Sequence, residues 1–256
     1  PTISPVAYSP AMGGPSAERE VSLRSGQMVV EALQPTGAVV LPVVIEDRHV
    51  SLPANVDVAF IAMHGAFGED GQIQRILEGR GVAYTGSDAE ASERAFDKIT
   101  AKDCFVEAGI PTPRYGDDVK FPVVVKPARQ GSSVGVTIVR DRQALDAALA
   151  KAREYDERIL VEEFIRGREL TVGILGNREL PVVEIRTASG FFGYREKYTA
   201  GGAEEIVPAP LDSTVTIKAQ RLSRLAHERL GCRDFSRVDL MLSDRGEVFV
   251  LEVNTI

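Results

Sequence analysis

The chain has 256 residues, a length that suits a large core or two to three compact domains. It contains 44% hydrophobic and 26% charged residues, as ordinary globular proteins do, and its net charge of −7 argues against a general nucleic-acid binder. No apolar run reaches membrane-spanning length, no signal-peptide pattern opens the sequence and the two cysteines form no CxxC motif, so we expect a reducing cytoplasmic location and no membrane partner.

The first 91 residues alternate strand and helix patterns, as open parallel α/β sheets do. The predicted elements are a strand at 3–8, a glycine loop at 11–17, a helix from 18 to about 33, and strands at 39–45 and 56–62. Ser16 is the expected cap of the helix. The last two runs are almost wholly apolar, which indicates strands buried on both faces. His64 lies in a glycine-rich loop at 63–71, where such a sheet usually binds ligand, although a single histidine is more often a hydrogen-bonded core residue than a base.

The middle of the chain predicts an antiparallel sheet with helices on one face. The predicted elements are a helix at 97–109, strands at 121–126 and 136–139, a second helix after 141, and strands at 158–165 and 169–175 that turn at 166–168. Asp97 and Asp141 are the expected helix caps. Lys98 and Lys102 lie one turn apart on the first helix, so they share a face.

Several residues of this middle part suit a nucleotide, and each has a plainer alternative. The loop 130–135 offers unobstructed backbone N–H groups to phosphate, but taken alone it favours a simple hairpin turn. Lys98 and Lys126 offer point charges to a polyphosphate, or are solvated surface lysines. Glu162 and Glu169 can accept from an adenine amine or a ribose hydroxyl, or they mark exposed strand ends.

The last third of the chain predicts a strand at 179–186, a long loop at 188–205 and a helix that begins after Asp212 and ends at Gly231. The loop has no clear hydrophobic period and holds four glycines. Long loops of this kind inside compact domains are commonly functional.

Residues 235–254 predict a β-hairpin whose turn cluster ends in Gly246. Side chains alternate between the two faces of a strand, so the pairing register decides which residues share a face. If Leu242 pairs with Glu247, one face carries Arg237, Asp239, Met241, Val248, Val250, Glu252 and Asn254. An odd-numbered turn would move the side chains of one strand to the opposite face.

The shared face would contain two carboxylates and an amide, and hard oxygen donors of this kind suit Mg²⁺. A solvated face with a cross-strand pair of Arg237 and Glu252 is the alternative. The valines expected on the same face favour a half-buried site over a solvated one.

Long motifs in chain order resemble the D-alanine–D-alanine ligase family. They read GGPSAEREVS at 13–22, HGAFGEDG at 64–71, YTG at 84–86, DK at 97–98, KP at 126–127 with GSSVG at 131–135, EKY at 196–198, and RVD at 237–239 with EVNT at 252–255. The resemblance covers essentially the whole chain. Several unrelated motifs in the right order are far more specific than any one of them.

The resemblance implies an ATP-grasp fold with ATP bound between its last two domains. The expected domains are an open parallel α/β domain at 1–93, a central lid domain at 94–166 and an antiparallel-sheet catalytic domain at 167–256. It further implies two Mg²⁺ ions, which Mn²⁺ can replace, ATP as co-substrate, cytoplasmic synthesis of peptidoglycan precursors and a homodimer. The family's contacts to the second D-alanine follow the position of Ile256, so we expect the catalytic domain to be incomplete at its C-terminal end.

The resemblance also implies the site residues. The metal ligands are Asp239, Glu252 and Asn254. The ATP-binding residues are Lys98, Lys126, Ser133, Glu162, Ile165, Glu169, Lys197 and Leu251. Glu18, with His64 nearby, binds the first D-alanine, and Ser132 and Tyr198 join Glu18 in a hydrogen-bonded set that ties the loop 188–205 to the substrate. Arg237 binds substrate and stabilises the charge of the tetrahedral intermediate.

The implied reaction joins two D-alanines through an acyl phosphate. The alternatives are a D-alanine–D-lactate ligase, a D-alanine–D-serine ligase, or a nucleotide-binding protein that has lost catalysis. Tyr198 argues against the lactate form, because related depsipeptide ligases resemble this pattern with phenylalanine there. The intact lysines and acidic residues argue against lost catalysis.

Overall fold

The computed structural model describes residues 5–187 and 202–256, so Lys197 and Tyr198 lie outside the described residues. The chain divides into a first unit, Pro1–Glu93 with Thr255–Ile256, and a second unit, Arg94–Asn254. A further division of the second unit near residue 166, into a lid and a catalytic domain, stays a prediction.

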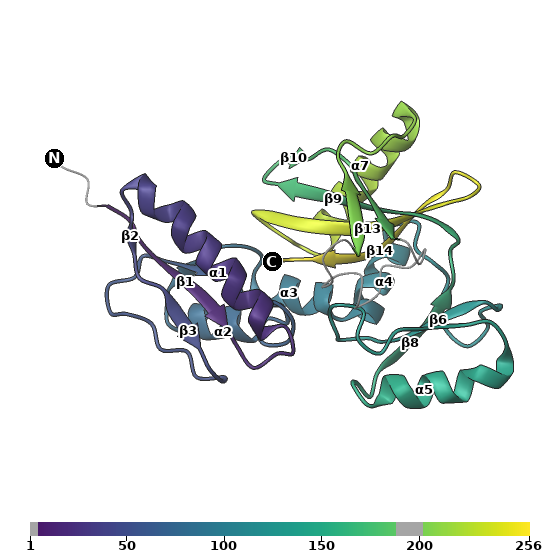
Figure 1. The fold of residues 1–256 in the computed structure, drawn as a ribbon, viewed down its shortest axis with the longest axis horizontal. Helices are drawn as coiled ribbons and strands as arrows, with labels where there is room; N and C mark the ends of the chain where they lie inside the picture. The colour runs from purple at the N-terminus through teal and green to yellow at the C-terminus, as the bar shows by residue number, and fades with distance from the viewer. Residues whose placement is uncertain (1–4, 188–201) are drawn as a thin grey trace. The chain divides into compact units, whose positions relative to one another are not determined.

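A five-stranded parallel sheet forms the first unit, with β1 at its centre paired to β2, β3 and β4 and with β5 next to β4 (Figure 1). Its elements are β1 (Ala7–Gly13), α1 (Arg19–Leu33), the 3-10 turn η1 (Gln34–Thr36), β2 (Val39–Val40), β3 (Val43–Ile45), β4 (Val58–Ile61), α2 (Gln72–Gly79), β5 (Ala83–Tyr84) and α3 (Ala89–Phe96), which leads into the second unit. The strand predicted at 3–8 was placed too early, since β1 runs to Gly13 and includes the start of the predicted loop. The predicted strand at 39–45 is two strands separated by Leu41 and Pro42, because proline has no N–H to donate to a sheet.

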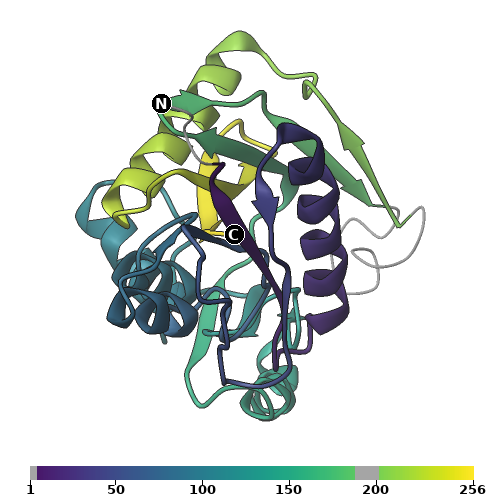
Figure 2. The same cartoon turned by 90° about the vertical axis from the view of Figure 1, so that its left-hand side faces the viewer.

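Both faces of this parallel sheet are covered, as the apolar runs predicted. Ala11 belongs to one core cluster with Ile73 of α2. Met12 points to the opposite face, where a Cβ atom on Gly26 of α1 would lie only 2.3 Å from the Met12 Cβ. Figures 1 and 2 show α1 and α2 on opposite sides of the sheet. Gly26 therefore allows α1 to approach β1 closely.

The second unit contains two antiparallel sheets. Its elements are α4 (Lys98–Glu107), β6 (Val123–Pro127), β7 (Thr137–Val139), η2 (Arg142–Ala144), α5 (Leu145–Arg153), β8 (Ile159–Glu163), β9 (Gly167–Leu175), β10 (Arg178–Glu179), β11 (Val183–Thr187), β12 (Ala203–Ile206), α7 (Ser213–Arg229), β13 (Phe235–Ser243) and β14 (Val248–Asn254). The smaller sheet has the order β7-β6-β8 and packs against α5. Asp141 caps η2, the 3-10 turn that leads into α5.

The larger sheet has the order β12-β11-β9-β13-β14, and β10 also pairs with β9. The predicted turn between β8 and β9 therefore joins two different sheets and not two strands of one hairpin. The loop predicted at 188–205 also ends earlier than expected, because residues 203–206 form β12 and pair with β11. Asp212 caps α7, and Gly231 at its end has a φ of 76°, as predicted.

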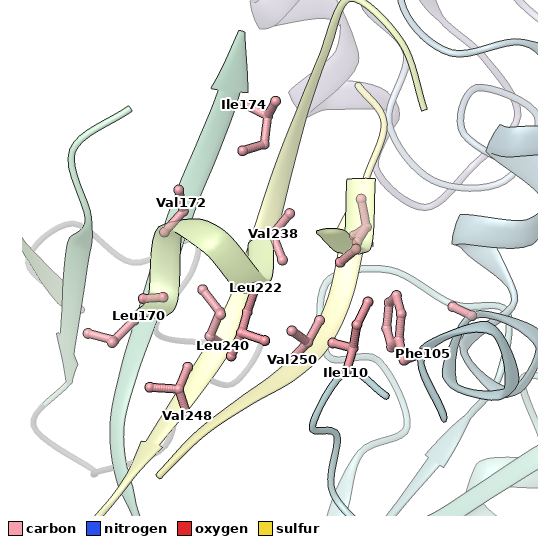
Figure 3. Packing of buried hydrophobic residues seen from close by; sticks show 14 of the residues in the cluster. Phe105, Ile110, Leu170, Val172, Ile174, Leu222, Val238, Leu240, Val248 and Val250 are labelled. Carbon is pink, nitrogen blue, oxygen red and sulfur yellow. The ribbon is translucent and has the colours of Figure 1, made fainter. Parts of the chain in front are cut away.

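One face of the larger sheet forms the main core. Figure 3 shows side chains of β9, β13 and β14 pointing toward Leu222 of α7 and toward Phe105 and Ile110 of the α4 region. Ala219, Leu222 and Ala226 of α7, and Leu230 directly after it, all belong to this cluster. The opposite face of the sheet carries polar side chains, among them Glu169, Asp239 and Glu252, that line a cavity.

The predicted register of the final hairpin was wrong at the turn. Leu242 pairs with Val248, because the turn has three residues between Ser243 and Glu247. Val248 and Val250 consequently lie in the apolar core and not beside Met241. A β-bulge next to Asp239 then inserts Leu251 as an extra residue. The odd turn and the bulge offset each other, so that the predicted polar set still shares one face.

Candidate active site

A cavity of about 490 Å³ lies within the second unit, in the size range of small-molecule sites. The glycine-rich loop between β6 and β7, the ends of β6 and β8, and the polar face of the larger sheet form its walls. Ten side chains predicted from the sequence line it: Lys98, Lys126, Ser132, Ser133, Glu162, Ile165, Glu169, Asp239, Leu251 and Glu252. Residues from five separate parts of the chain therefore meet at one cavity.

A buried carboxylate between two ammonium groups forms one wall. Glu162 Oε1 lies 2.5 Å from Lys126 Nζ, and Glu162 Oε2 lies 2.7 Å from Lys102 Nζ. Burial alone would raise the pKa of Glu162, but the two lysines together lower it. Burial would lower the pKa of Lys126 as well, and Glu162 and Glu252 raise it instead. Glu162 is therefore not an exposed strand-end group, and Lys126 is not a solvated surface lysine, as the plainer alternatives had it.

Lys98 connects the glycine-rich loop to the final hairpin. Its Nζ donates to the Gln130 carbonyl oxygen at 2.8 Å and lies 3.0 Å from Glu252 Oε2. Asp97 caps α4, as predicted, by accepting from the backbone N–H groups of residues 99 and 100. Arg158 holds the other Asp97 oxygen at 2.6 Å. The start of α4 is thereby fixed, and Lys98 extends from it into the cavity.

The glycine-rich loop has a strained backbone. Ser132 and Ser133 have φ values of 50° and 57°, and each left-handed residue of this kind costs roughly 1–2 kcal/mol. Tyr155 packs beside Gly135, where a Cβ atom would lie 2.9 Å from its ring, and its carbonyl oxygen accepts from Gln130 Nε2 at 3.0 Å. Backbone strain of this sort gathers at ligand-binding segments, so this observation favours a phosphate loop over a plain hairpin turn.

Asp239 is the centre of the polar hairpin face. Arg237 donates to both of its carboxylate oxygens at 3.0 Å. Thr171 Oγ1 donates to Oδ1 at 2.7 Å, and Asn254 Nδ2 donates to Oδ2 at 3.0 Å. Glu252 pairs with Asp239 across the strands, so the two carboxylates share the face that lines the cavity.

This donor set fits a divalent cation of the Mg²⁺ class. Asp239 and Glu252 supply carboxylate oxygens and Asn254 an amide oxygen, which are the hard ligands that Mg²⁺ prefers. In the structure Arg237 and Lys98 neutralise the two carboxylates, which is the charge that such a cation would supply. Among the described residues no three His, Cys, Asp or Glu side chains form a metal-binding group, so the set depends on the amide.

Glu18 and His64 lie in the first unit. Glu18, and not the predicted Ser16, is the N-cap residue of α1, and the Ser16 hydroxyl accepts from the Glu18 N–H at 3.1 Å. A Cβ atom on Gly65 would lie 2.6 Å from Glu18 Oε2, so the carboxylate lies directly against the loop 63–71. The predicted link from Glu18 to Ser132 and Tyr198 stays a prediction.

His64 is held to the same helix through hydroxyl groups. Its Nε2 lies 2.9 Å from Ser25 Oγ, its backbone N–H donates to Ser22 Oγ at 2.9 Å, and its carbonyl oxygen accepts from Ser16 Oγ at 2.7 Å. These contacts agree with the prediction that His64 is a hydrogen-bonded residue and not a base. They also place His64 beside the start of α1, where Glu18 is found.

Two family models match the sequence. The model described as the D-ala D-ala ligase C-terminus matches residues 94–256, and the model described as the D-ala D-ala ligase N-terminus matches residues 48–87. The chain belongs to the D-alanine–D-alanine ligase family.

Relatives in this family are similar over most of their length. The D-alanine–D-alanine ligase of Methylacidiphilum infernorum is 46% identical over 251 residues, covering 95% of this chain and 83% of that protein. The D-alanine–D-alanine ligase of Citrifermentans bemidjiense is 47% identical over 256 residues, covering 96% and 84%.

Solved structures of the family confirm the ATP-grasp fold. The VanG D-Ala:D-Ser ligase of Enterococcus faecalis has a TM-score of 0.87 at 30% identity, covering 99% of this chain and 91% of that one. The D-alanine–D-alanine ligase of Bacillus anthracis complexed with ATP has a TM-score of 0.86 at 32% identity, covering 99% and 87%.

None of the described helices combines the length and apolar character needed to cross a membrane.

Two residues at the site, Lys102 and Thr171, have contacts that the sequence does not predict. Lys102 was recognised only as a neighbour of Lys98 on α4, and its contact with Glu162 depends on a strand 60 residues further along the chain. Thr171 carries no motif at all, and the pairing of β9 with β13 brings it to Asp239. The helical spacing of Lys98 and Lys102 was the one available signal for the first residue.

Proposed function

We propose that this chain joins two D-alanines into D-alanyl-D-alanine at the expense of ATP. The observation that carries the proposal is the cavity that Lys98, Lys126, Asp239 and Glu252 line together, with Lys98 Nζ 3.0 Å from Glu252 Oε2. Support comes from family relatives named D-alanine–D-alanine ligase at 42–47% identity and from the similar structure that contains ATP.

A carboxylate is a poor acyl donor, so the first D-alanine must take the γ-phosphoryl group of ATP. Lys98, Lys126 and Lys197 offset the negative charge of the phosphates and of the incoming carboxylate. Ser133 in the strained loop and Ile165, Glu162, Glu169 and Leu251 along the walls bind the rest of the nucleotide. Asp239, Glu252 and Asn254 would hold two Mg²⁺ ions, which supply charge stabilisation to the phosphate oxygens when bound.

The second step makes the peptide bond. The amine of the second D-alanine attacks the acyl carbon, the bond from that carbon to the phosphate oxygen breaks, and the amine releases its proton as phosphate leaves. Arg237 is half-exposed beside the cavity and stabilises the negative charge that develops on the carbonyl oxygen. Glu18 binds the ammonium group of the first D-alanine near His64, and Ser132 and Tyr198 hold the closed arrangement that excludes water.

We further propose the cellular setting that goes with this activity. D-Alanyl-D-alanine is a precursor of peptidoglycan and its synthesis uses ATP, so the enzyme acts in the cytoplasm. The resemblance to the family separately implies a homodimer. The membrane and nucleic acids have no part in the reaction.

The decisive experiment incubates the protein with ATP, Mg²⁺ and D-alanine and measures dipeptide and phosphate together. The expected result is one phosphate per dipeptide and no dipeptide without Mg²⁺. Phosphate release without any dipeptide, or no release with D-alanine present, would overturn the proposal.

A D-alanine–D-serine ligase is the second candidate, because the similar VanG structure is described as such an enzyme. Its identity of 30% is lower than the 46% of the D-alanine–D-alanine ligase of Methylacidiphilum infernorum. Adding equal amounts of D-serine and D-alanine to the assay separates the two. We expect D-alanyl-D-alanine as the main product.

A further inference from the structure

Lys102 lies behind the wall of the cavity and has no exposed surface. Besides the ion pair with Glu162, its ammonium group donates to Thr112 Oγ1 at 2.5 Å and to the Pro113 carbonyl oxygen at 3.2 Å. Tyr115 covers it, with the ring centroid 5.4 Å from Nζ. Lys102 does not line the cavity, so it has no direct access to a ligand.

Lys102 nevertheless contacts Glu162, a residue that lines the cavity. Glu162 lines the wall, and its two oxygens are fixed from two sides, by Lys126 of β6 and by Lys102 of α4. The two ammonium groups keep the carboxylate ionised, as the lowered pKa of Glu162 indicates. An ionised carboxylate only accepts hydrogen bonds, and each of its oxygens has two lone pairs, so acceptor capacity remains toward the cavity.

We propose that Lys102 is a positioning residue that fixes Glu162 as an acceptor at the cavity wall and thereby sets the preference of the site for a nucleotide base with an exocyclic amine. The inference rests on the proposed ATP site. Adenine carries an amine at purine C6 and can donate to a fixed carboxylate. Inosine has a carbonyl oxygen at that position, which faces the carboxylate as a second acceptor, so the hydrogen bond between the base and Glu162 is lost.

A purely structural role for Lys102 makes a different prediction. Removing a buried, fully bonded ammonium group weakens the fold in either case, because Glu162 loses one of two counter-charges. A structural role alone would leave the ratio of ATP to ITP affinity unchanged in the folded protein. The positioning role lowers that ratio, since the carboxylate is no longer held in place.

The test measures the binding of ATP and of ITP, each with Mg²⁺, by calorimetry in the full chain. The variants are Lys102→Met, which removes the ammonium, and Thr112→Val, which keeps it but removes one of its partners. Lys151→Met, an exposed lysine on α5, is the matched control. Thermal unfolding of each variant shows whether it is folded.

We expect wild type to bind ATP about tenfold or more tightly than ITP. Lys102→Met should lower that ratio about fivefold, mainly through weaker ATP binding, and Thr112→Val about twofold, whereas Lys151→Met should not change it. An unchanged ratio in folded Lys102→Met overturns the inference. If that variant does not fold, an unchanged ratio in Thr112→Val overturns it.

The outcomes separate this inference from the proposed function. A wild-type protein that makes dipeptide but binds ATP and ITP equally overturns the inference alone. A protein that prefers ATP, loses that preference in Lys102→Met and makes no dipeptide overturns the proposed function alone. Absence of binding to either nucleotide overturns both.

Discussion

The two faces of the β13–β14 hairpin differ completely although they share one backbone. Val238, Leu240 and Val250 on one face are fully buried against α7 and the α4 region. Arg237, Asp239 and Glu252 on the other face line or adjoin the cavity and are held by ion pairs and hydrogen bonds. Burying such charges without partners would be costly, so each has a counter-charge. Because successive side chains of a strand point to opposite faces, one face of this hairpin stabilises the fold and the other carries the polar residues of the site.

The largest effect is expected from Glu252→Gln, on the polar face. It keeps the shape of the side chain but removes a charge that we assign to metal binding, so phosphoryl transfer should fall on the order of 10³-fold. The melting temperature should change little, since Glu252 contributes nothing to the apolar core. Glu247→Gln, an exposed glutamate in the turn of the same hairpin, is the control and should keep full activity. Near-normal turnover of folded Glu252→Gln at saturating Mg²⁺ would exclude the metal assignment.

The opposite face should respond in the opposite way. Leu240→Ala removes a fully buried side chain and leaves a cavity, so the free energy of unfolding should fall by about 2–5 kcal/mol. Activity per folded molecule should remain within about twofold, because Leu240 points away from the cavity. Leu175→Ala, at the exposed end of β9, is the control and should change stability by less than about 1 kcal/mol. Lost activity with normal stability would contradict the separation of the two faces.

A smaller effect is expected from Thr171→Val, which removes the hydroxyl that donates to Asp239 Oδ1. The carboxylate keeps Arg237 and Asn254 as partners, so its orientation loosens but its charge remains. The Mg²⁺ concentration for half-maximal activity should rise roughly tenfold. Thr214→Val removes a similar hydroxyl–carboxylate contact, to Asp212 at the start of α7, and should leave the Mg²⁺ dependence unchanged. Equal effects of the two variants would mean that Thr171 acts only on the fold.

The smallest effect is expected in the pH dependence of stability, from His227 on the buried face of the larger sheet. Burial lowers the pKa of His227, whose Nδ1 lies 2.8 Å from Ser236 Oγ behind the sheet. The unfolded chain therefore binds the proton first as the pH falls through about 6.5, and stability is lost below that pH. In His227→Gln the decline of the melting temperature between pH 7 and pH 5 should be shallower than in wild type. A decline of the same slope would show that other groups control it.

Ten of the residues predicted from the sequence line the cavity, because family motifs mark many of these positions, whereas the role of each residue stays a prediction. The sequence predicted correctly that the polar residues of the hairpin share one face, although the predicted register was wrong. The three-residue turn and the bulge at Leu251 each shift the pairing by one residue, and the two shifts cancel. Such compensation depends on how β14 packs against the core, which no local pattern encodes. The same limit explains Lys102 and Thr171, whose roles arise only from contacts between distant strands and helices.

The most direct test of the metal assignment is a crystal structure of the protein with ADP and Mn²⁺, in which anomalous scattering locates the metal ions. We expect two Mn²⁺ ions within bonding distance of Asp239, Glu252 and Asn254, with Lys98 and Arg237 displaced from the carboxylates they now contact. A structure with the nucleotide in the cavity and Mn²⁺ bound elsewhere, or with both carboxylates still paired to these cations, would contradict it.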